Sequence, residues 1–246
     1  RLRFLSGPAF GRMHGRIAVS EAARESIAHY FPGEFEIIPN GVDTERFHPE
    51  VKPVVDRDEN RPTILFVGRA DPRKGLPILI QAFDRLRETM PEARLLVVGV
   101  ERDEVASELE GVSSTTRASI EFAGYADPAD MAGYYTSCDV FCSPATGQES
   151  QGIVLLEAMA AGRPPVAFAI PGYRDVVQHG VDGWLVDRIG VEELAAGLST
   201  ILADRVALFR MAETGRKTAL GFSWPSVVER LERHYAKALE IKGRNA

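Results

Sequence analysis

The chain contains 246 residues, of which 45% are hydrophobic and 26% charged, and it has a formal net charge of −6 at pH 7. This size and composition are typical of a globular protein with one large domain, or one domain and a fragment of another. The acidic balance argues against general nucleic-acid binding, and no apolar run approaches the roughly 18 residues of a membrane span. Cys138 and Cys142 share one apolar, strand-like run, so we expect buried, reduced thiols and a cytoplasmic protein.

The first part of the chain predicts a small β-α-β unit at residues 17–38, in which Ser20 caps the helix. Two short strands cannot bury both faces of a sheet by themselves. We therefore interpret residues 1–40 as the terminal fragment of another domain. Residues 41–62 contain Pro49 and few apolar side chains, which is typical of a linker.

From residue 63 the pattern changes to strands that alternate with helices. Apolar runs predict strands at 64–67, 95–98, 120–122, 140–142, 166–168 and 184–186. Helices are expected at 76–89, 101–110, 128–137, 152–161, 191–202 and 206–220, and a last one follows Ser223. The alternation predicts an α/β fold, with a Rossmann-like parallel sheet and helices on both faces over residues 63–222 and a C-terminal helix at 223–246.

Ligands of such sheets bind beyond the carboxyl ends of the strands, where three loops should meet. The first loop, Gly68–Gly75, directly follows a buried strand and carries Arg69 and Lys74, which can both reach a phosphate. A basic surface loop is the alternative. The second loop, Gly124–Asp127, could hold a nucleobase beside Tyr125, or could be a plain turn that caps the next helix.

The third loop leads into the helix that begins after Gly152. We expect Glu149 in the loop and Glu157 in the second turn, because an unbroken helix would leave the two carboxylates about 80° apart. The free backbone N–H groups of Gly152, Ile153 and Val154 predict an anion site with a carboxylate on either side. Glu157 can then accept hydrogen bonds from two vicinal hydroxyls of a ribose, and Glu149 can accept them from hydroxyls of a sugar on the far phosphate. Two solvated or ion-paired glutamates are the alternative.

Several other kinds of site are excluded by their missing motifs. No Gly-Lys-Ser/Thr sequence indicates a P-loop, no strand ends in Gly-x-Gly-x-x-Gly, and no Asp-x-Asp follows a strand to hold Mg²⁺. The five histidines are scattered, without the spacing of metal ligands. We therefore expect no metal, and the charge of a phosphate must be met by Arg, Lys and helix N-termini.

The three loops, in this order, resemble those of glycosyltransferase family 4, the retaining GT-B enzymes. Gly68–Gly75 resembles the family's Gly-Arg-…-Lys-Gly loop, and Glu149 with Glu157 resembles its Glu-x7-Glu motif. Asn40–Asp43 resembles the family's interdomain junction, and Ser223–Trp224 its usual C-terminal ending. The likeness therefore covers nearly the whole chain.

The resemblance implies a role for each candidate residue. The stretch from Glu149 onward is most similar to that of the phosphatidylinositol mannosyltransferases, with Gln151 where the family typically has Phe. Arg69 and Lys74 would bind the donor diphosphate and Glu149 the donor hexose, as catalytic residues. Further donor contacts would come from Gly68, Tyr125, Ala126, Gly152, Ile153, Val154 and Glu157, the last of which would bind the ribose. The implied donor is GDP-mannose, with a UDP-hexose as the alternative, and no metal or separate cofactor is implied.

The resemblance also implies that a larger enzyme surrounds this chain. GT-B enzymes have two Rossmann-like domains, and residues 1–40 match only the last β-α-β of the N-terminal one. Residues 223–246 match the helix that crosses back onto that domain, which normally supplies the acceptor site, with a lipid as one candidate acceptor, and any docking surface for the inner face of the membrane. We therefore expect the donor-binding half of a retaining glycosyltransferase, weakly active alone, which dimerises by exchange of its N-terminal segment. A nucleotide-sugar epimerase of the same fold and a non-catalytic nucleotide-sugar binding module stay open.

Overall fold

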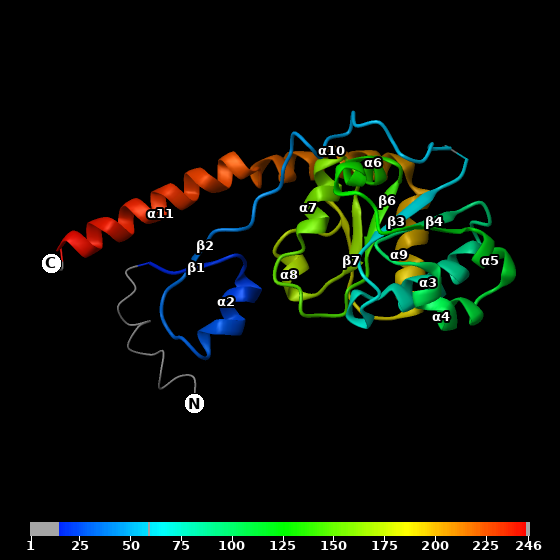
Figure 1. The fold of residues 1–246 in the computed structure, drawn as a ribbon, viewed down its shortest axis with the longest axis horizontal. Coiled ribbons are helices and arrows are strands. Elements are labelled where there is room, and N and C mark those ends of the chain that lie inside the picture. The colour runs from blue at the N-terminus through cyan, green and yellow to red at the C-terminus, as the bar shows by residue number, and fades with distance from the viewer. Residues whose placement is uncertain (1–14, 59, 245–246) are drawn as a thin grey trace.

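The structure, a computed structural model, describes residues 15–58 and 60–244. Residues 1–14 of the expected terminal fragment lie outside the described residues. The main unit is a six-stranded parallel sheet in the order β5-β4-β3-β6-β7-β8 (Figure 1). Its strands are β3 Thr63–Val67, β4 Arg94–Val98, β5 Ile120–Gly124, β6 Val140–Ser143, β7 Pro165–Phe168 and β8 Trp184–Val186. The predicted α/β fold with a parallel sheet is confirmed.

Helices cover both faces of this sheet because parallel strands need crossover connections. They are α3 Leu76–Arg87, α4 Ala106–Glu110, α5 Ser114–Ala118, α6 Met131–Thr136, α7 Ile153–Ala160, α8 Pro171–Arg174, α9 Val191–Ala203 and α10 Arg205–Gly221. Right-handed crossovers place α3 and α4 on one face and α6 and α7 on the other. The strand order reverses at β3, so the gap between β3 and β6 is the switch point at which such sheets bind ligands.

The core lies between the sheet and these helices. Every residue of β4, β6 and β7 is buried, as expected for strands with helices on both faces. The apolar stripe that predicted α3 faces the sheet, and Leu79, Ile80 and Phe83 are each 0% exposed. Cys138 and Cys142 are buried and unpaired, and burial raises the pKa of the Cys138 thiol to about 12. Both cysteines are therefore protonated packing residues at neutral pH.

The helix boundaries differ from the prediction where helices are short. The helix expected at 101–110 begins as a 3₁₀ turn, Arg102–Val105, and the one expected at 128–137 begins as another, Pro128–Asp130. Helices α5 and α8 have only five and four residues and were not predicted. An element of about one turn cannot display the 3.6-residue period on which the prediction rests.

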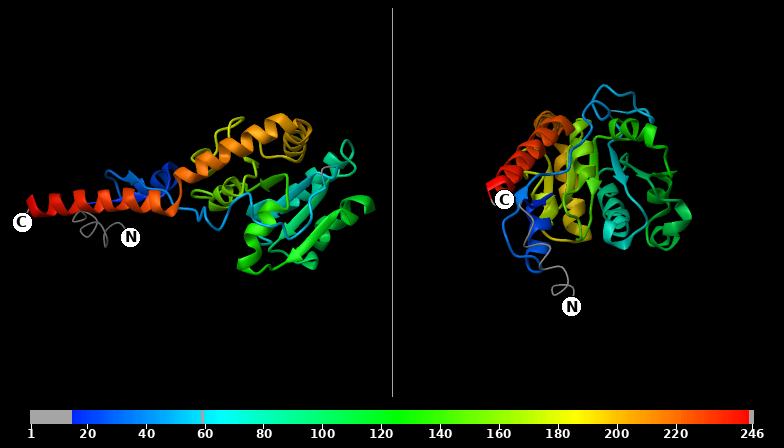
Figure 2. Two further views of the ribbon diagram at one scale, coloured as in Figure 1. Left: turned by 90° about the horizontal axis from the view of Figure 1, so that it is seen from above. Right: turned by 60° about the vertical axis from the view of Figure 1, so that its left-hand side comes forward.

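The N-terminal β-α-β unit is present and separate from the main sheet. Strands β1 Ile17–Ala18 and β2 Glu36–Ile37 pair in parallel, and helix α2 Glu21–Ala28 connects them. The predicted cap is confirmed, because the Ser20 hydroxyl accepts from the N–H of Ala23 at 2.9 Å. Figure 2 shows this unit beside the C-terminal helix, beyond the end of the main sheet.

That C-terminal helix, α11 Trp224–Arg244, is held against the small unit by side-chain contacts. His234 Nδ1 lies 2.8 Å from Glu36 Oε2, and Arg230 donates to the backbone oxygen of Ile37 at 2.6 Å. No helix in the described part of the chain is both long enough and apolar enough to cross a bilayer.

The segment between the two units lies along the main sheet. Val42 and Phe47 are 2% and 4% exposed and belong to its core. The Phe47 ring packs edge-on against Tyr135, with 5.6 Å between the centroids. Val42 also forms a β-bridge with Ser223. The two chain segments that connect the small unit and α11 to the main unit therefore lie side by side at this point.

Candidate functional site

A cavity of about 320 Å³ opens at the carboxyl edge of the sheet, beside the switch point. Three segments that are distant in the sequence line it. They are the junction after β2 at Asn40, the turn after β3 at Arg73 and Lys74, and the loop and helix start at 148–154. The predicted meeting of the first and third loops is therefore present, and Asn40 of the predicted interdomain junction forms a third wall.

The turn after β3 is shaped by its own residues. Pro72–Lys74 forms a 3₁₀ turn, and the Asp71 side chain caps it by accepting from the N–H of Arg73 at 3.1 Å. Gly75 follows with φ 76°, and a Cβ on it would lie 1.9 Å from the carbonyl oxygen of Pro144. Only glycine permits this approach, which brings the turn against the segment that follows β6.

The close approach of this turn to the segment after β6 places two cations beside one carboxylate. Lys74 Nζ lies 2.6 Å and Arg73 Nη1 3.2 Å from Glu149 Oε1, and the side chains of Lys74 and Glu149 are only 24% and 15% exposed. Arg73 was not among the predicted site residues. Its adjacency to Lys74 was the available signal, but the orientation of the turn decides which cations face Glu149.

The start of α7 forms the opposite wall of the cavity. Gly152 has φ 76°, and a Cβ on it would lie 2.6 Å from the Tyr173 ring. The first N–H groups of a helix have no partners within the helix, and here Gly152, Ile153 and Val154 all line the cavity. Two cations and a helix N-terminus thus face the same space, which suits an anionic group.

The loop before α7 is strained and is held by the N-terminal unit. Gln148 has φ 58° and is the one non-glycine residue with positive φ in the described part of the chain. The Ser20 hydroxyl donates to the backbone oxygen of Ser150, and the Ala22 N–H donates to Asp175 at 3.1 Å. Gln151 lines the cavity, but its side-chain amide is hydrogen-bonded to Asn40.

Glu157 lies in the second turn of α7 but outside this cavity. Its Oε2 accepts from the Tyr135 hydroxyl at 2.7 Å. Burial raises the pKa of the Glu157 carboxyl, while the Tyr135 hydrogen bond and the charge of Arg46 oppose that rise. Tyr135 is fully buried and was missed by sequence reasoning, because an aromatic residue in an apolar helix looks like an ordinary core residue.

The structure does not bring the remaining predicted residues into the cavity. Arg69 is exposed, and Gly68 ends β3 by donating its N–H to the Val98 oxygen at 3.0 Å. Tyr125 and Ala126 directly follow β5 and do not line the cavity. Tyr125 is 66% exposed, and its hydroxyl donates to the Glu104 carboxylate at 3.2 Å. No group of three or more His, Cys, Asp or Glu that could hold a metal ion occurs among the described residues.

Comparison with known proteins gives one consistent family. The family model described as "Glycosyl transferases group 1" matches residues 48–218. Phosphatidyl-myo-inositol mannosyltransferase of Mycobacterium tuberculosis is 35% identical over 233 residues, which cover 93% of this chain and 61% of the relative. The chain therefore spans less than two thirds of the length of the curated relatives it matches.

Solved structures agree on the fold. Sucrose-phosphate synthase from Thermosynechococcus elongatus superposes with a TM-score of 0.77 at 27% identity, over 92% of this chain and 58% of that one. An Anabaena protein solved with UDP and glucose superposes with a TM-score of 0.79 at 23% identity, over 96% of this chain and 66% of that one. The chain has the fold of the C-terminal half of GT-B glycosyltransferases.

Proposed function

Because the chain belongs to the group 1 glycosyl transferases, which are glycosyltransferase family 4, we propose that it is the donor-binding part of a retaining hexosyltransferase. It binds a nucleoside diphosphate hexose, with GDP-mannose favoured. The observation that carries this proposal is the joint presence of Lys74, Arg73 and the start of α7 around one cavity at the switch point of the sheet.

This arrangement suits the main electrostatic task of glycosyl transfer. When the bond between the anomeric carbon and the phosphate oxygen breaks, the nucleoside diphosphate leaves with the electron pair. Negative charge then grows on its phosphates, where preoriented cations and N–H groups stabilise it most. A diphosphate that takes over Lys74 and Arg73 releases Glu149 Oε1 from its two ion pairs. The freed carboxylate can accept hydrogen bonds from hydroxyl groups of the donor hexose.

The other proposed residues extend the donor site beyond the cavity. Glu157 binds the ribose hydroxyls through the carboxylate that Tyr135 orients. Tyr125 and Ala126 lie beside the base, and Arg69 reaches the diphosphate by rotation of its exposed side chain. Gly68 allows the backbone to approach the donor.

Mannose is favoured because the relative at 35% identity is named a mannosyltransferase. A thermal-shift panel of GDP, UDP and ADP with their hexose conjugates tests base and sugar together. A ligand at about 100 times its Kd should raise the free energy of unfolding by roughly 2.7 kcal/mol. GDP-mannose should give the largest shift, and a larger shift with a UDP-hexose would reassign the donor.

Two variants test the site itself. Glu157→Ala should remove most of the response to the nucleotide. Glu149→Ala should keep the response to the nucleotide and lose the additional response to the sugar. If both variants bind GDP-mannose as the unaltered chain does, the proposed site is wrong.

The acceptor belongs to the remainder of a longer enzyme in this proposal. The chain alone should bind the donor and transfer hexose poorly. In the full-length protein, which would be cytoplasmic, a lipid acceptor would bind at the inner face of the membrane. Robust transfer to an acceptor by the purified chain would contradict this division. Release of a free epimer from the donor would point instead to an epimerase.

A further inference from the structure

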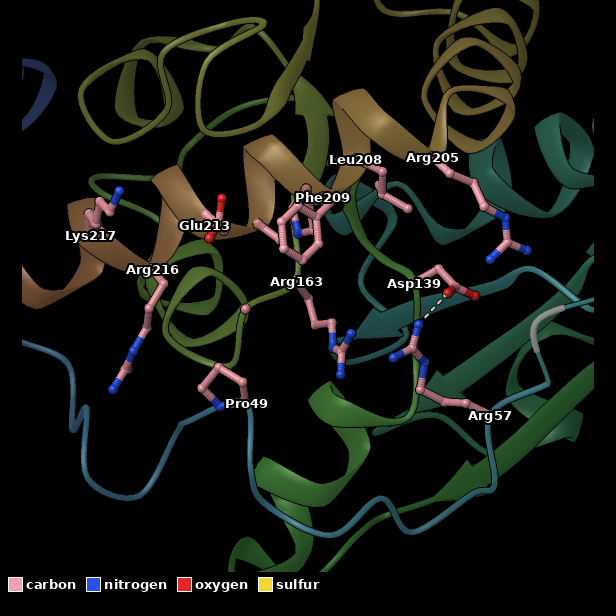
Figure 3. A pocket seen from close by; sticks show the side chains of 13 residues that line it. Pro49, Arg57, Asp139, Arg163, Arg205, Leu208, Phe209, Glu213, Arg216 and Lys217 are labelled. Carbon is pink, nitrogen blue, oxygen red and sulfur yellow. Dashed lines mark hydrogen bonds and ion pairs between the residues drawn. The ribbon is translucent and has the colours of Figure 1, made fainter.

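A second and larger cavity, of about 650 Å³, opens at the opposite edge of the sheet (Figure 3). Asp139 and Pro164, which directly precede β6 and β7, line it together with helix α10 and the segment that carries Pro49 and Arg57. Strands of four or five residues rise about 3.3 Å per residue, so the two cavities are roughly 15 Å apart across the sheet. We call this space the amino-edge pocket.

The charge around the amino-edge pocket is unbalanced. Five cationic side chains and two carboxylates line it. Arg57 is paired with Asp139 at 2.6 Å. Arg163 and Arg216 have no carboxylate partner among the described residues.

These two guanidinium groups are half-buried and bound only to backbone oxygens. Arg163 donates to Thr136 at 3.1 Å, and Arg216 donates to Phe47, Ala160 and Thr44 at 2.8 to 3.1 Å. The Nε of Arg163 is buried without any hydrogen-bond partner, and burial lowers the pKa of both side chains. Asp139 lies near enough to favour the charged form of Arg163, but it is already paired with Arg57. A buried charge that is offset only in part costs free energy unless an anion approaches it.

One wall of the amino-edge pocket carries apolar side chains between two arginines. Helix α10 places Arg205, Phe209, Ala212 and Arg216 on one face, at spacings of four, three and four residues. The Phe209 ring is 65% exposed, and Figure 3 shows it directly above Arg163, between the flanking cations. An aromatic ring or an acyl chain can lie against this wall while a phosphate meets the arginines.

We infer that the amino-edge pocket is a second ligand site, for a phosphate-bearing ligand that also carries an apolar or aromatic portion. Its volume is in the range of small-molecule sites, and its residues are not those of the donor cavity. The inference therefore stands independently of the proposed transferase activity. The ligand could be a soluble phosphate ester or the headgroup of a phospholipid, which share this chemistry.

Calorimetric titration of the chain with 1-naphthyl phosphate tests the site, with 1-naphthol as the uncharged control. The phosphate should bind and the naphthol should not. Arg163→Ala and Phe209→Ala should each weaken binding about tenfold, as expected for a lost charge-assisted hydrogen bond or aromatic wall. Arg210→Ala, on the same helix but outside the pocket, should leave the affinity unchanged.

The donor-cavity variant Lys74→Ala separates the two sites. Its affinity for 1-naphthyl phosphate should equal that of the unaltered chain. Binding that depends on Lys74 and not on Arg163 would place the phosphate in the donor cavity and overturn the inference. Phe209 is exposed, so Phe209→Ala keeps the test valid if Arg163→Ala fails to fold.

Sedimentation with vesicles identifies the source of the phosphate. Vesicles of phosphatidylcholine with phosphatidic acid are compared with vesicles of phosphatidylcholine alone. Sedimentation that needs phosphatidic acid, Arg163 and Phe209 indicates a lipid headgroup, whereas naphthyl phosphate binding without sedimentation indicates a soluble ester. If neither probe binds, the amino-edge pocket is not a phosphate site.

Discussion

The side-chain amide of Gln151 is bound to Asn40 by three hydrogen bonds. Its Oε1 accepts from the backbone N–H at 2.7 Å and from Nδ2 at 3.0 Å, and its Nε2 donates to the backbone oxygen at 3.1 Å. Gln151 is 3% exposed, so these bonds are shielded from water. They join the loop that lines the proposed donor cavity to the end of the N-terminal β-α-β unit.

Gln151→Ala should destabilise the chain by about 1 to 3 kcal/mol, because it leaves the N–H groups of Asn40 without their acceptor. Urea unfolding measures the change. The matched control is Gln178→Ala, which truncates an exposed glutamine and should change the free energy of unfolding by less than about 0.5 kcal/mol. Equal effects of the two substitutions would show that the Asn40 contact contributes nothing.

Lys74→Ala should weaken GDP binding at least about tenfold, because it removes the proposed charge-assisted hydrogen bond to the diphosphate. Calorimetric titration with GDP measures the affinity. Lys52→Ala, which removes an exposed lysine that does not line the cavity, is the control and should bind GDP normally. An unchanged affinity in Lys74→Ala would exclude Lys74 from the donor site.

Nucleotide affinity should depend on pH through Glu157, whose carboxyl pKa burial raises above 4.5. In the proposed site the ribose hydroxyls donate to the ionised Glu157 carboxylate, so the affinity for the nucleotide should fall as the pH drops through this raised pKa. Tyr135→Phe removes a hydrogen bond that lowers the pKa, so its affinity should begin to fall at a higher pH. Titrations with GDP over a pH series measure both profiles, and superimposable profiles would contradict the role of Tyr135.

The same raised pKa sets the sign of the effect on stability. Glu157 binds its proton more tightly in the folded chain than in the unfolded chain. Its contribution to stability is therefore largest below the unfolded pKa and declines as the pH rises from there to the folded pKa. Glu157→Gln should remove this decline, which unfolding experiments at a series of pH values would detect.

Gly152→Ala should be more destabilising than Gly180→Ala, although the two glycines have nearly the same φ, 76° and 75°. A Cβ at Gly152 meets the Tyr173 ring at 2.6 Å, whereas a Cβ at Gly180 meets nothing within 4 Å. The clash at Gly152 should increase the loss in the free energy of unfolding by about 1 to 3 kcal/mol, which urea unfolding measures. Equal losses would mean that the start of α7 shifts freely, and the anion site could then not depend on its position.

The chain should dimerise at high concentration through apolar surface on its C-terminal helix. Val228, Tyr235 and Leu239 of α11 are 43%, 55% and 68% exposed, beside the small N-terminal unit that would be exchanged. Leu239→Glu should shift the mass measured by light scattering toward the monomer. A monomeric mass for the unaltered chain at high concentration contradicts the prediction.

Much of the fold could be predicted from the sequence because it depends on local periodicity. The six strands of the main sheet, the cap at Ser20 and the place of Glu149 ahead of α7 all follow from residues close together in the chain. The short helices α5 and α8 could not be predicted, since about one turn shows no period. The buried position of Phe47 in an expected linker could not be predicted either, since a single apolar residue carries no pattern.

The sequence by itself determined that a basic loop and a glutamate-bearing helix start would meet at one edge of a parallel sheet. Only the tertiary structure decided that Arg73 and Lys74, and not Arg69, face Glu149, that Gln151 turns to Asn40, and that the amino-edge pocket exists. Lys74 and Glu149 are 75 residues apart in the chain, and Gln151 and Asn40 are 111 apart. Such pairs depend on the rotation of turns and helices in the packed molecule, about which local periodicity carries no information.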